Sequence, residues 1–366
     1  MDSGSGQIVV TTRYGRKTLY TEGDALYAAM LEAIAAAQHS VKLESYIFAN
    51  DDVGRRFAAG LSARARAGVR VLVNIDAAGS LFWGSHRMEK GMQCAGVQVH
   101  WFHRWSWRDP ARYNRRNHRK LLVVDAQRGF LGGFNIHREN SRAAYGAERW
   151  RDTHLEIDGQ LARNLDVLFD AFWTRRRRNF SVLRSRQGNL ITNHSRYGRL
   201  LLRDLYAARF TAARERVWLT TPYFVPDSRT QRALRSAARR GVDVRVLVPH
   251  KNDVRVVQWA ARAAYAGLLQ AGIRIYEYLP RVLHAKTVVV DGIWSSVGTA
   301  NIDYRSFFLN YELTFTLRDA DFATVLERQF RADLEAAVQI QPSLWAKRAL
   351  WRRMLEFIGW LARRWL

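Results

Sequence analysis

The sequence is short of cysteine and of long apolar runs. Its single cysteine, Cys94, excludes an internal disulfide framework and is typical of a reducing compartment. No window reaches the roughly 18 unbroken apolar residues of a membrane span, and residues 1–17 lack the apolar stretch of a signal peptide. We therefore expect a protein that meets a membrane only from the side.

Negative charge is scarce as well. The 366 residues include 33 Asp and Glu against 58 Lys and Arg, which gives a formal net charge of +25. Such a surface attracts polyanions, chiefly nucleic acid or the anionic leaflet of a bilayer, although basic residues can also serve solubility alone. Lysine is rare among the basic residues, with 7 Lys beside 51 Arg. A lysine at a repeated position therefore indicates a need for a compact ammonium group, which suits a single phosphate oxygen.

One pattern occurs twice in the chain. Residues 116–136 read RNHRKLLVVDAQRGFLGGFNI, and residues 283–303 read LHAKTVVVDGIWSSVGTANID. One ordered copy arises by chance in well under one chain in about 10,000, so two copies at equivalent places make coincidence negligible. The matched residues are, in order, His118, Lys120, Asp125, Gly132 and Asn135 in the first copy and His284, Lys286, Asp291, Gly298 and Asn301 in the second.

Each copy predicts a cluster of donors for one small anion. On a β-strand, His118 and Lys120 point to the same face. Asp125, at the strand's end, points away from them, and we expect it to anchor the hairpin by accepting hydrogen bonds from turn backbone, as Asp291 does in the second copy. The glycine pair then permits close backbone approach, and Asn135 returns on the adjacent strand with its amide near the same spot.

The repeat extends over both halves of the chain. Strands alternating with helices favour α/β structure with largely parallel sheets covered by helices. We predict two pseudo-twofold-related α/β lobes, each a mostly parallel mixed β-sheet flanked by helices, over residues 1–190 and 191–342. The similar extended segments are 40–52 and 216–228, 67–76 and 240–250, and 95–103 and 271–279.

Bringing the two copies together places two histidines, two lysines and two asparagines around one pocket. This set suits phosphodiester cleavage: one imidazole attacks phosphorus to form a phosphohistidine, the other protonates the leaving oxygen, and the cations hold the phosphoryl oxygens. No pattern resembles a metal site, and we expect no cofactor. Acidic residues follow both copies at equivalent places, Asp152 and Glu312. We predict that each bonds the far nitrogen of an imidazole, the alternative being an ordinary surface acid.

Two aromatic and basic segments lie outside the motif. Residues 343–366 carry apolar side chains at helical spacing with Arg and Lys between them. This pattern is typical either of an amphipathic helix at a membrane interface or of a terminal helix packed on the protein. Residues 101–116, WFHRWSWRDPARYNRR, come just before His118. They either line the access route for acyl chains and head groups or form a surface loop anchored by tryptophan.

The repeated motif resembles the signature of the phospholipase D superfamily, the paired HKD motif, and the resemblance covers nearly the whole chain. Several stretches are most similar to bacterial cardiolipin synthases of the short type, which lack N-terminal transmembrane helices: NRRNHRKLLVVD, GGFNI, WRDTHLEIDG, TPYFVPD and NIDYRSFFLNYE. The resemblance implies two α/β lobes and metal-independent ping-pong transfer. It makes His118 and His284 the nucleophile and the acid/base, and it places Lys120, Lys286, Asn135 and Asn301 on the phosphate. With the histidines and lysines, Asp125 and Asp291 complete the motif residues that the resemblance implies to be catalytic. Gly133 stands where Ser or Thr is usual, and Thr299 is its counterpart.

The resemblance also implies a transferase acting on phospholipids. A phosphatidyl group of phosphatidylglycerol would move to the first histidine with release of glycerol, and a second phosphatidylglycerol would collect it to give cardiolipin. The implied partners are these anionic phospholipids at the cytoplasmic face of the bacterial inner membrane, with peripheral attachment and no nucleic acid. The alternatives are another acceptor (phosphatidylethanolamine, glycerol or water), a nuclease, and a non-catalytic binding protein. The sequence leaves open which histidine attacks first, the acyl preference and the oligomeric state.

Overall fold

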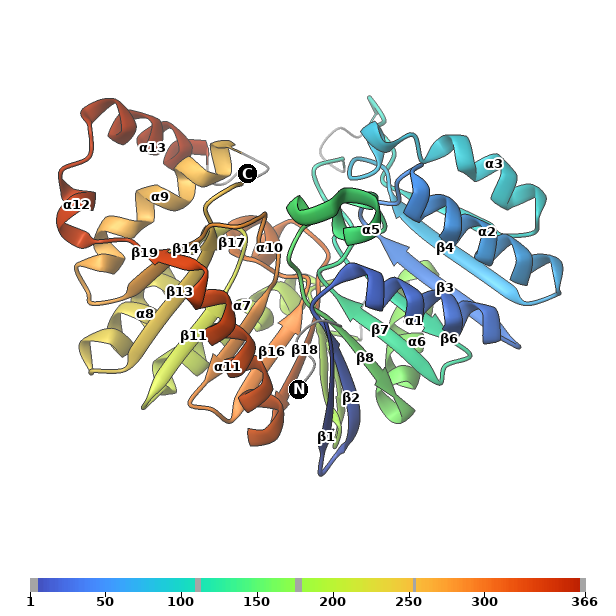
Figure 1. Cartoon of the computed structure of the whole chain (residues 1–366), viewed down its shortest axis with the longest axis horizontal. Coiled ribbons are helices and arrows are strands. Elements are labelled where there is room, and N and C mark those ends of the chain that lie inside the picture. The colour runs from blue at the N-terminus through green and yellow to red at the C-terminus, as the bar shows by residue number, and fades with distance from the viewer. Residues whose placement is uncertain (1–5, 109–112, 175–179, 253–254, 363–366) are drawn as a thin grey trace.

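Two similar lobes stand side by side in the computed structural model, which describes residues 6–108, 113–174, 180–252 and 255–362 (Figure 1). Each lobe is a mixed β-sheet with helices packed against its faces. The predicted two-lobe α/β architecture is confirmed.

The first lobe is built on an eight-stranded sheet of order β1-β2-β8-β7-β6-β3-β4-β5. Its middle strands are almost continuous apolar runs, as in the VLVNI of β4, because they are buried on both faces. The strands are β1 (Gln7–Thr12), β2 (Gly15–Tyr20), β3 (Ser40–Ser45), β4 (Arg70–Asp76), β5 (Gln98–Phe102), β6 (Leu121–Val124), β7 (Arg128–Gly132) and β8 (His154–Asp158). The helices are α1 (Gly23–Ala36), α2 (Asp52–Arg66), α3 (His86–Cys94), α5 (Arg142–Tyr145) and α6 (Gly159–Trp173), with short 3₁₀ helices η1 (Leu81–Trp83), η2 (Arg138–Asn140) and η3 (Gly146–Glu148).

The second lobe is built on a nine-stranded sheet of order β19-β14-β13-β11-β15-β16-β18-β10-β9, and β12 and β17 form a separate parallel pair. The strands are β9 (Val182–Ser185), β10 (Gly188–Thr192), β11 (Arg216–Thr220), β12 (Phe224–Val225), β13 (Asp243–Pro249), β14 (Arg274–Tyr278), β15 (Thr287–Val290), β16 (Trp294–Gly298), β17 (Ile302–Asp303), β18 (Leu313–Arg318) and β19 (Ala337–Gln339). The helices are α7 (Arg196–Ala212), α8 (Ser228–Arg239), α9 (Arg255–Leu269), α10 (Tyr304–Phe308), α11 (Ala320–Glu335), α12 (Pro342–Ala346) and α13 (Leu350–Ala362).

The two large sheets have the same strand order, with β19 added at one edge of the second. Parallel pairing is confined to β3-β4-β5 in the first sheet and to β11-β13-β14 in the second, and the other described pairs of these sheets are antiparallel. The sheets are therefore mixed, as expected, but not mostly parallel. The reason is that two hairpins in each lobe contribute most of the other strands, and a hairpin joins antiparallel strands.

The boundary between the lobes lies earlier than the sequence indicated. The hairpin of β9 and β10 pairs with β18 of the second sheet, just as the hairpin of β1 and β2 pairs with β8 of the first. By sheet membership the second lobe thus begins at or before Val182 and not at residue 191. Gly188 and Asn189, next to the predicted boundary, belong to this hairpin, where Gly188 has a φ of +134° that glycine adopts readily.

A shared core joins the two lobes. Strands β6 to β8 of the first sheet and β15, β16 and β18 of the second contribute to one buried cluster with α6 and α11, which includes Leu121, Leu155, Val289 and Phe315. Burying one such side chain stabilises the fold by about 1.5–3 kcal/mol. Because the strands that carry the repeated motif lie in this cluster, the core fixes the two copies relative to one another.

The C-terminal segment forms two helices, not one. The short α12 is followed by α13, which packs along α9 (Figure 1). Residues 363–366, the end of the predicted helix, lie outside the described residues. Nowhere in the described ranges is a helix both long enough and apolar enough to cross a bilayer.

Candidate active site

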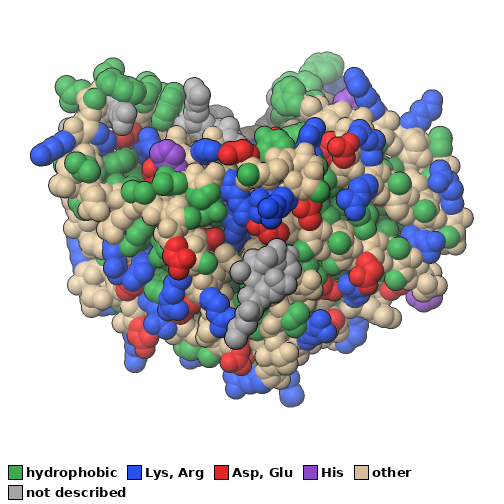
Figure 2. Space-filling view, viewed as in Figure 1, with side chains coloured by type: hydrophobic (Ala, Val, Ile, Leu, Met, Phe, Trp, Pro, Cys, Tyr) green, Lys and Arg blue, Asp and Glu red, His purple; other side chains and the backbone are tan. Residues whose placement is uncertain are grey.

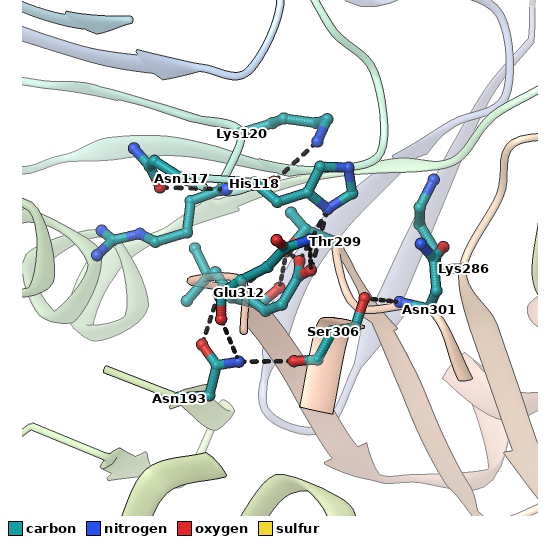
Figure 3. Close-up of polar contacts among 12 residues, drawn as sticks. Asn117, His118, Lys120, Asn193, Lys286, Thr299, Asn301, Ser306 and Glu312 are labelled. Atoms are coloured by element: carbon teal, nitrogen blue, oxygen red, sulfur yellow. Dashed lines mark hydrogen bonds and ion pairs between the residues drawn. The ribbon is translucent and has the colours of Figure 1, made fainter. Parts of the chain in front are cut away.

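The two copies of the motif meet where the lobes join. His118 and Lys120 lie on the extended segment that leads into β6, and His284 and Lys286 lie on the segment that leads into β15. All four residues are at most 7% exposed. The close-up shows Lys286 across the site from His118 and Lys120 (Figure 3). The structure thus brings the two predicted sets of groups together.

Backbone hydrogen bonds between the lobes produce this arrangement. The N–H of His118 donates to the carbonyl of Tyr311 at 2.9 Å, and the N–H of His284 donates to the carbonyl of Arg151 at 2.7 Å. These bonds belong to two short parallel bridges that join the lobes at equivalent places. Each histidine therefore lies beside the acidic residue that comes next in the chain of the opposite lobe.

The two acidic residues bind the histidines in a crossed arrangement. Nδ1 of His118 lies 3.0 Å from Oε2 of Glu312, and Nδ1 of His284 lies 2.5 Å from Oδ2 of Asp152. Both carboxylates are fully buried. Since a carboxylate engages Nδ1 of each ring, Nε2 is the nitrogen that each imidazole offers for chemistry, and in His284 it lies 3.0 Å from Nζ of Lys286. Each lobe thus supplies one imidazole and orients the imidazole of the other lobe.

The two carboxylates differ in charge state. Burial raises the pKa of Glu312 to about 7, although Lys120 acts against this shift. Burial would also raise the pKa of Asp152, but Lys286 and His284 outweigh it and hold the pKa of this carboxyl below its usual value. At neutral pH, Asp152 is therefore ionised, whereas Glu312 carries its proton for part of the time.

The surroundings of both histidines lower their pKa values and so favour the neutral imidazole. Burial, reinforced by Lys120 and Lys286, places the pKa of His118 well below its ordinary value. Burial and Lys286 also lower the pKa of His284, but Asp152 acts in the opposite direction there. The imidazole that is best able to carry a proton is thus His284, because an ionised carboxylate lies against it.

Each lysine contacts the histidine of its own motif copy, Lys120 at the backbone carbonyl and Lys286 at the ring. Nζ of Lys120 donates to the carbonyl of His118 at 2.8 Å, and Nζ of Lys286 lies 2.8 Å from Nδ1 and 3.0 Å from Nε2 of His284. Burial, together with the charge of Lys286, lowers the pKa of Lys120 to about 7. Two buried ammonium groups at one site repel each other, and an anion bound between them would relieve that repulsion.

The two asparagines of the motif are buried at the site. Oδ1 of Asn135 accepts a hydrogen bond from the N–H of Ile47 at 3.1 Å, so this amide has its NH₂ group left to donate. The backbone N–H of Asn301 donates to Oγ of Ser306 at 3.1 Å (Figure 3). Within the described part of the chain, Oδ1 of Asn301 has no hydrogen-bond partner.

The residue after each motif glycine distinguishes the copies. A Cβ atom at Gly133 would lie 1.9 Å from Oδ1 of Asp152, so any side chain here would displace that carboxylate. In the second copy Oγ1 of Thr299 donates to Oε2 of Glu312 at 2.5 Å. At the position where Ser or Thr is usual, Gly133 therefore leaves space for Asp152.

The aspartates of the motif lie at the opposite end of their strands from the histidines. Asp125 accepts hydrogen bonds from the N–H groups of Gln38, His39 and Ser40 at 2.7–2.8 Å. Asp291 accepts equivalent bonds from residues 214–216. Both have a positive φ, of 54° and 53° respectively. They anchor the hairpin turn, as expected from their position, and they take no place in the pocket.

Sequence reasoning missed several buried polar residues that hold the histidine segments. The side chain of Asn193 donates to the carbonyls of Ser306 and Asn310 and accepts from the N–H of Glu312 at 2.6 Å (Figure 3). Oδ2 of Asp76, at the end of β4, accepts from the N–H of Asn117 at 2.7 Å. A carboxylate that ends a buried apolar strand was the available signal for Asp76. For Asn193 the sequence offered none.

No cluster of three or more His, Cys, Asp or Glu side chains suited to a metal ion occurs among the residues that the structure describes. The polar groups that converge on the pocket are the imidazole, ammonium, amide and carboxyl groups described above.

Comparison with known proteins identifies the family of the chain. The family model described as "Cardiolipin synthase, PLD-like domain" matches twice, at residues 30–173 and 206–334. Cardiolipin synthase 2 of Bacillus anthracis is 34% identical over 370 residues, which cover 96% of this chain and 70% of the relative. Cardiolipin synthase of Geobacillus kaustophilus is 35% identical over 358 residues, which cover 93% and 70%.

Solved structures show the same fold. Phosphatidylserine synthase of Haemophilus influenzae matches with a TM-score of 0.71 and 11% identity, over 99% of this chain and 98% of that one. Polyphosphate kinase of Porphyromonas gingivalis matches with a TM-score of 0.66 and 15% identity, over 90% of this chain and 49% of that one. The family match and the curated relatives establish the chain as a phosphatidyltransferase of the phospholipase D superfamily that belongs to the cardiolipin synthase family.

Proposed function

We propose that this enzyme makes cardiolipin by moving a phosphatidyl group from one phosphatidylglycerol to a second, with release of glycerol. The observation that carries the proposal is the crossed pairing of His118 with Glu312 and of His284 with Asp152 at the lobe junction. Two imidazoles held in this way, beside two buried lysines, meet the needs of a two-step transfer at phosphorus.

His118 is the proposed nucleophile and His284 the proposed acid. Attack requires a neutral imidazole with a free lone pair, and the lowered pKa of His118 favours that form. The leaving glycerol oxygen requires a proton, and an imidazolium is stabilised best at His284, where Asp152 is ionised. The difference between the two carboxyl groups thus supports this choice of roles, which the symmetric motif left open.

In the first step, Nε2 of His118 attacks phosphorus as the bond from phosphorus to the glycerol oxygen breaks and His284 gives its proton to that oxygen. In the second step, a hydroxyl oxygen of the incoming phosphatidylglycerol attacks phosphorus, and its proton passes to His284 as the P–N bond breaks. Lys120, Lys286, Asn135 and Asn301 stabilise the charge on the phosphoryl oxygens throughout.

The substrates place the enzyme at an anionic leaflet. Phosphatidylglycerol and cardiolipin are both acidic lipids, and a polybasic face gains about 1 kcal/mol per Lys or Arg near such a surface. We assign the protein to the cytoplasmic face of the bacterial inner membrane as a peripheral enzyme. The net charge of +25 and the family of its relatives support this location.

Lipid products test the proposal most simply. The enzyme is incubated with phosphatidylglycerol, with and without phosphatidylethanolamine, and the lipids are separated by thin-layer chromatography. Cardiolipin and free glycerol from phosphatidylglycerol alone are the expected products. Cardiolipin that forms only when phosphatidylethanolamine is added would instead identify that lipid as the second substrate. Phosphatidic acid as the sole product would make the enzyme a hydrolase.

A further inference from the structure

Two exposed apolar patches, one on each lobe, have no role in the chemistry described so far. The first patch is Leu81, Phe82, Trp105 and Trp107, which are 50–93% exposed. The second patch is made by α13 and consists of Leu350, Trp351, Met354, Phe357, Ile358 and Leu361, which are 52–75% exposed. Apolar surface of this extent usually marks a contact with a partner or a membrane.

The two patches lie on the same side of the molecule. Figure 2 shows hydrophobic side chains gathered at the two upper corners, on either side of a hollow between the lobes. Helices α5 and α10, which adjoin the motif segments, lie between these corners (Figure 1). The first patch follows the carboxyl ends of β4 and β5, and the second rests on α9, which follows β13. The patches therefore flank the active site at the same edge of both sheets.

Helix α13 exposes most of its apolar side chains and buries a charged one, which is the reverse of the usual arrangement of a surface helix. Its side against α9 includes Gly359, where a Cβ would lie 2.5 Å from the backbone nitrogen of Ala260, and the buried Glu356. Glu356 is paired with Arg348 at 2.5 Å. A surface helix normally buries its apolar stripe and exposes its polar face. Because α13 does the opposite, its apolar face is suited to an apolar phase outside the protein.

Basic side chains surround both patches. Arg104 and Arg108 are exposed in the first, and the guanidinium of Arg108 lies 5.7 Å from the ring of Trp107. Lys347 is exposed beside the second. Tryptophan and leucine bordered by cations are the composition of a surface that inserts shallowly at the head groups of an anionic bilayer.

A cavity adjoins the first patch. It has a volume of about 540 Å³, and its lining includes Leu81, Trp101, Trp105 and Tyr113. The ring of Tyr113 lies 4.3 Å from the guanidinium of Arg116, which is two residues before His118. The lining of the cavity also includes His86, Glu89 and Arg104. A largely apolar pocket that adjoins the first patch is suited to an acyl chain of a lipid in the bilayer.

We propose that the two patches together dock the enzyme on the surface of an anionic phospholipid bilayer, with the active site between them. The inference deepens the proposed function and rests on it for the identity of the lipid. It decides between the two alternatives for residues 343–366: α13 packs on the protein through its small and polar side and meets the membrane with its apolar side.

Co-flotation with lipid vesicles tests the docking surface. The full chain is mixed with vesicles of equal parts phosphatidylglycerol and phosphatidylcholine, or of phosphatidylcholine alone. One variant carries Phe82→Ser and Trp107→Ser, a second carries Trp351→Ser and Phe357→Ser, and a third carries all four changes. The matched control carries Val9→Ser and Val167→Ser, which are 48% and 43% exposed and lie outside both patches. Circular dichroism checks that each variant is folded.

Each pair of changes is expected to lower the vesicle partition coefficient about tenfold or more, and the four changes together by about the product of the two effects. The control and the wild type float equally, and both prefer the anionic vesicles. Wild-type-like flotation of the fourfold variant would overturn the proposal, as would equal binding of wild type to phosphatidylcholine alone. A dimer that the fourfold changes abolish without loss of flotation would show that the patches bind a second copy instead.

Turnover of detergent-dispersed phosphatidylglycerol separates this inference from the proposed function. The patch variants are expected to form cardiolipin there at the wild-type rate, because the catalytic groups are untouched. A wild-type protein that binds vesicles through its patches but makes no cardiolipin would contradict the proposed function and would still support the docking surface.

Discussion

The two lobes have the same strand order but differ in the groups that orient the opposite histidine. The first lobe uses Asp152, which stays ionised and has room because residue 133 is glycine. The second uses Glu312, which titrates near 7 and accepts a hydrogen bond from Thr299. A duplicated scaffold thus delivers two imidazoles symmetrically, and we propose that the differences beside them suit one imidazole to attack and the other to proton transfer.

The lobes also differ in how they obtain an apolar surface. In the first lobe the exposed apolar patch is formed by the connections after β4 and β5, whereas in the second lobe it is formed by the C-terminal helix α13. The same edge of both sheets is served by unrelated segments. The two lobes are therefore alike in the strands and segments that carry the motif, and they differ in the segments that form the exposed apolar patches.

Removing either histidine should have the largest effect. His118→Ala and His284→Ala are each expected to lower cardiolipin formation by about 10,000-fold or more, because each step of the transfer needs both groups. Thin-layer chromatography of labelled lipid measures the loss, and unchanged vesicle flotation shows that the fold is intact. Cardiolipin formation at the wild-type rate by either variant would contradict the proposed mechanism.

The carboxylates provide the sharpest test of the difference between the lobes. Asp152→Asn should reduce turnover by about 1,000-fold, because an amide cannot stabilise the imidazolium of His284. Glu312→Gln should cost only about tenfold, since that carboxyl is partly neutral already and an amide oxygen can still accept from Nδ1. Steady-state kinetics on both variants gives the comparison. Equal losses would mean that the two carboxyl groups act alike.

The residues after the motif glycines should respond unequally. Gly133→Ala places a methyl group against Asp152 and is expected to reduce turnover about 100-fold, because the carboxylate must leave His284. Thr299→Val keeps the shape but removes one hydrogen bond to Glu312, which costs about 1–2 kcal/mol, or about tenfold. Turnover and melting temperature of both variants test this order. Wild-type turnover by Gly133→Ala would contradict the close approach of Asp152 to residue 133.

The affinity for a phosphodiester should depend on pH. As the pH rises through 7, Lys120 loses a positive charge and Glu312 gains a negative one, because both have a pKa of about 7. Both changes oppose anion binding, so the affinity for a soluble phosphodiester should fall about tenfold between pH 6 and pH 8. Calorimetric titration measures it, and Lys120→Gln should flatten the profile. An affinity that rises with pH would contradict the assignment.

Much of the site could be predicted because the motif that forms it occurs twice in the sequence. The order and spacing of His118 and Lys120, repeated at His284 and Lys286, predicted which side chains would meet in one pocket. The anchoring role of Asp125 followed from strand alternation alone. What the repeat could not reveal is the crossed pairing of carboxylates with imidazoles, since it depends on bridges between segments almost 200 residues apart, such as His118 and Tyr311.

The errors in the predicted fold have physical causes too. Residues 182–192 were divided between the lobes because a hairpin turn and a linker have similar composition. The parallel character of the sheets was overestimated because short apolar strands look alike whichever way their neighbours run. The orientation of α13 was undecided, because spacing alone does not distinguish a buried apolar stripe from an exposed one.

The central claim is that His118 forms the covalent intermediate while His284 serves the departing and arriving oxygens. A phosphatidyl ester of p-nitrophenol tests it directly, because nitrophenolate leaves without needing a proton. His284→Ala should release a burst of one nitrophenolate per chain and retain a phosphatidyl group on His118, detected by mass spectrometry at alkaline pH. A variant that releases no burst, or a phosphatidyl group found on His284 of the His118→Ala protein, would contradict the account.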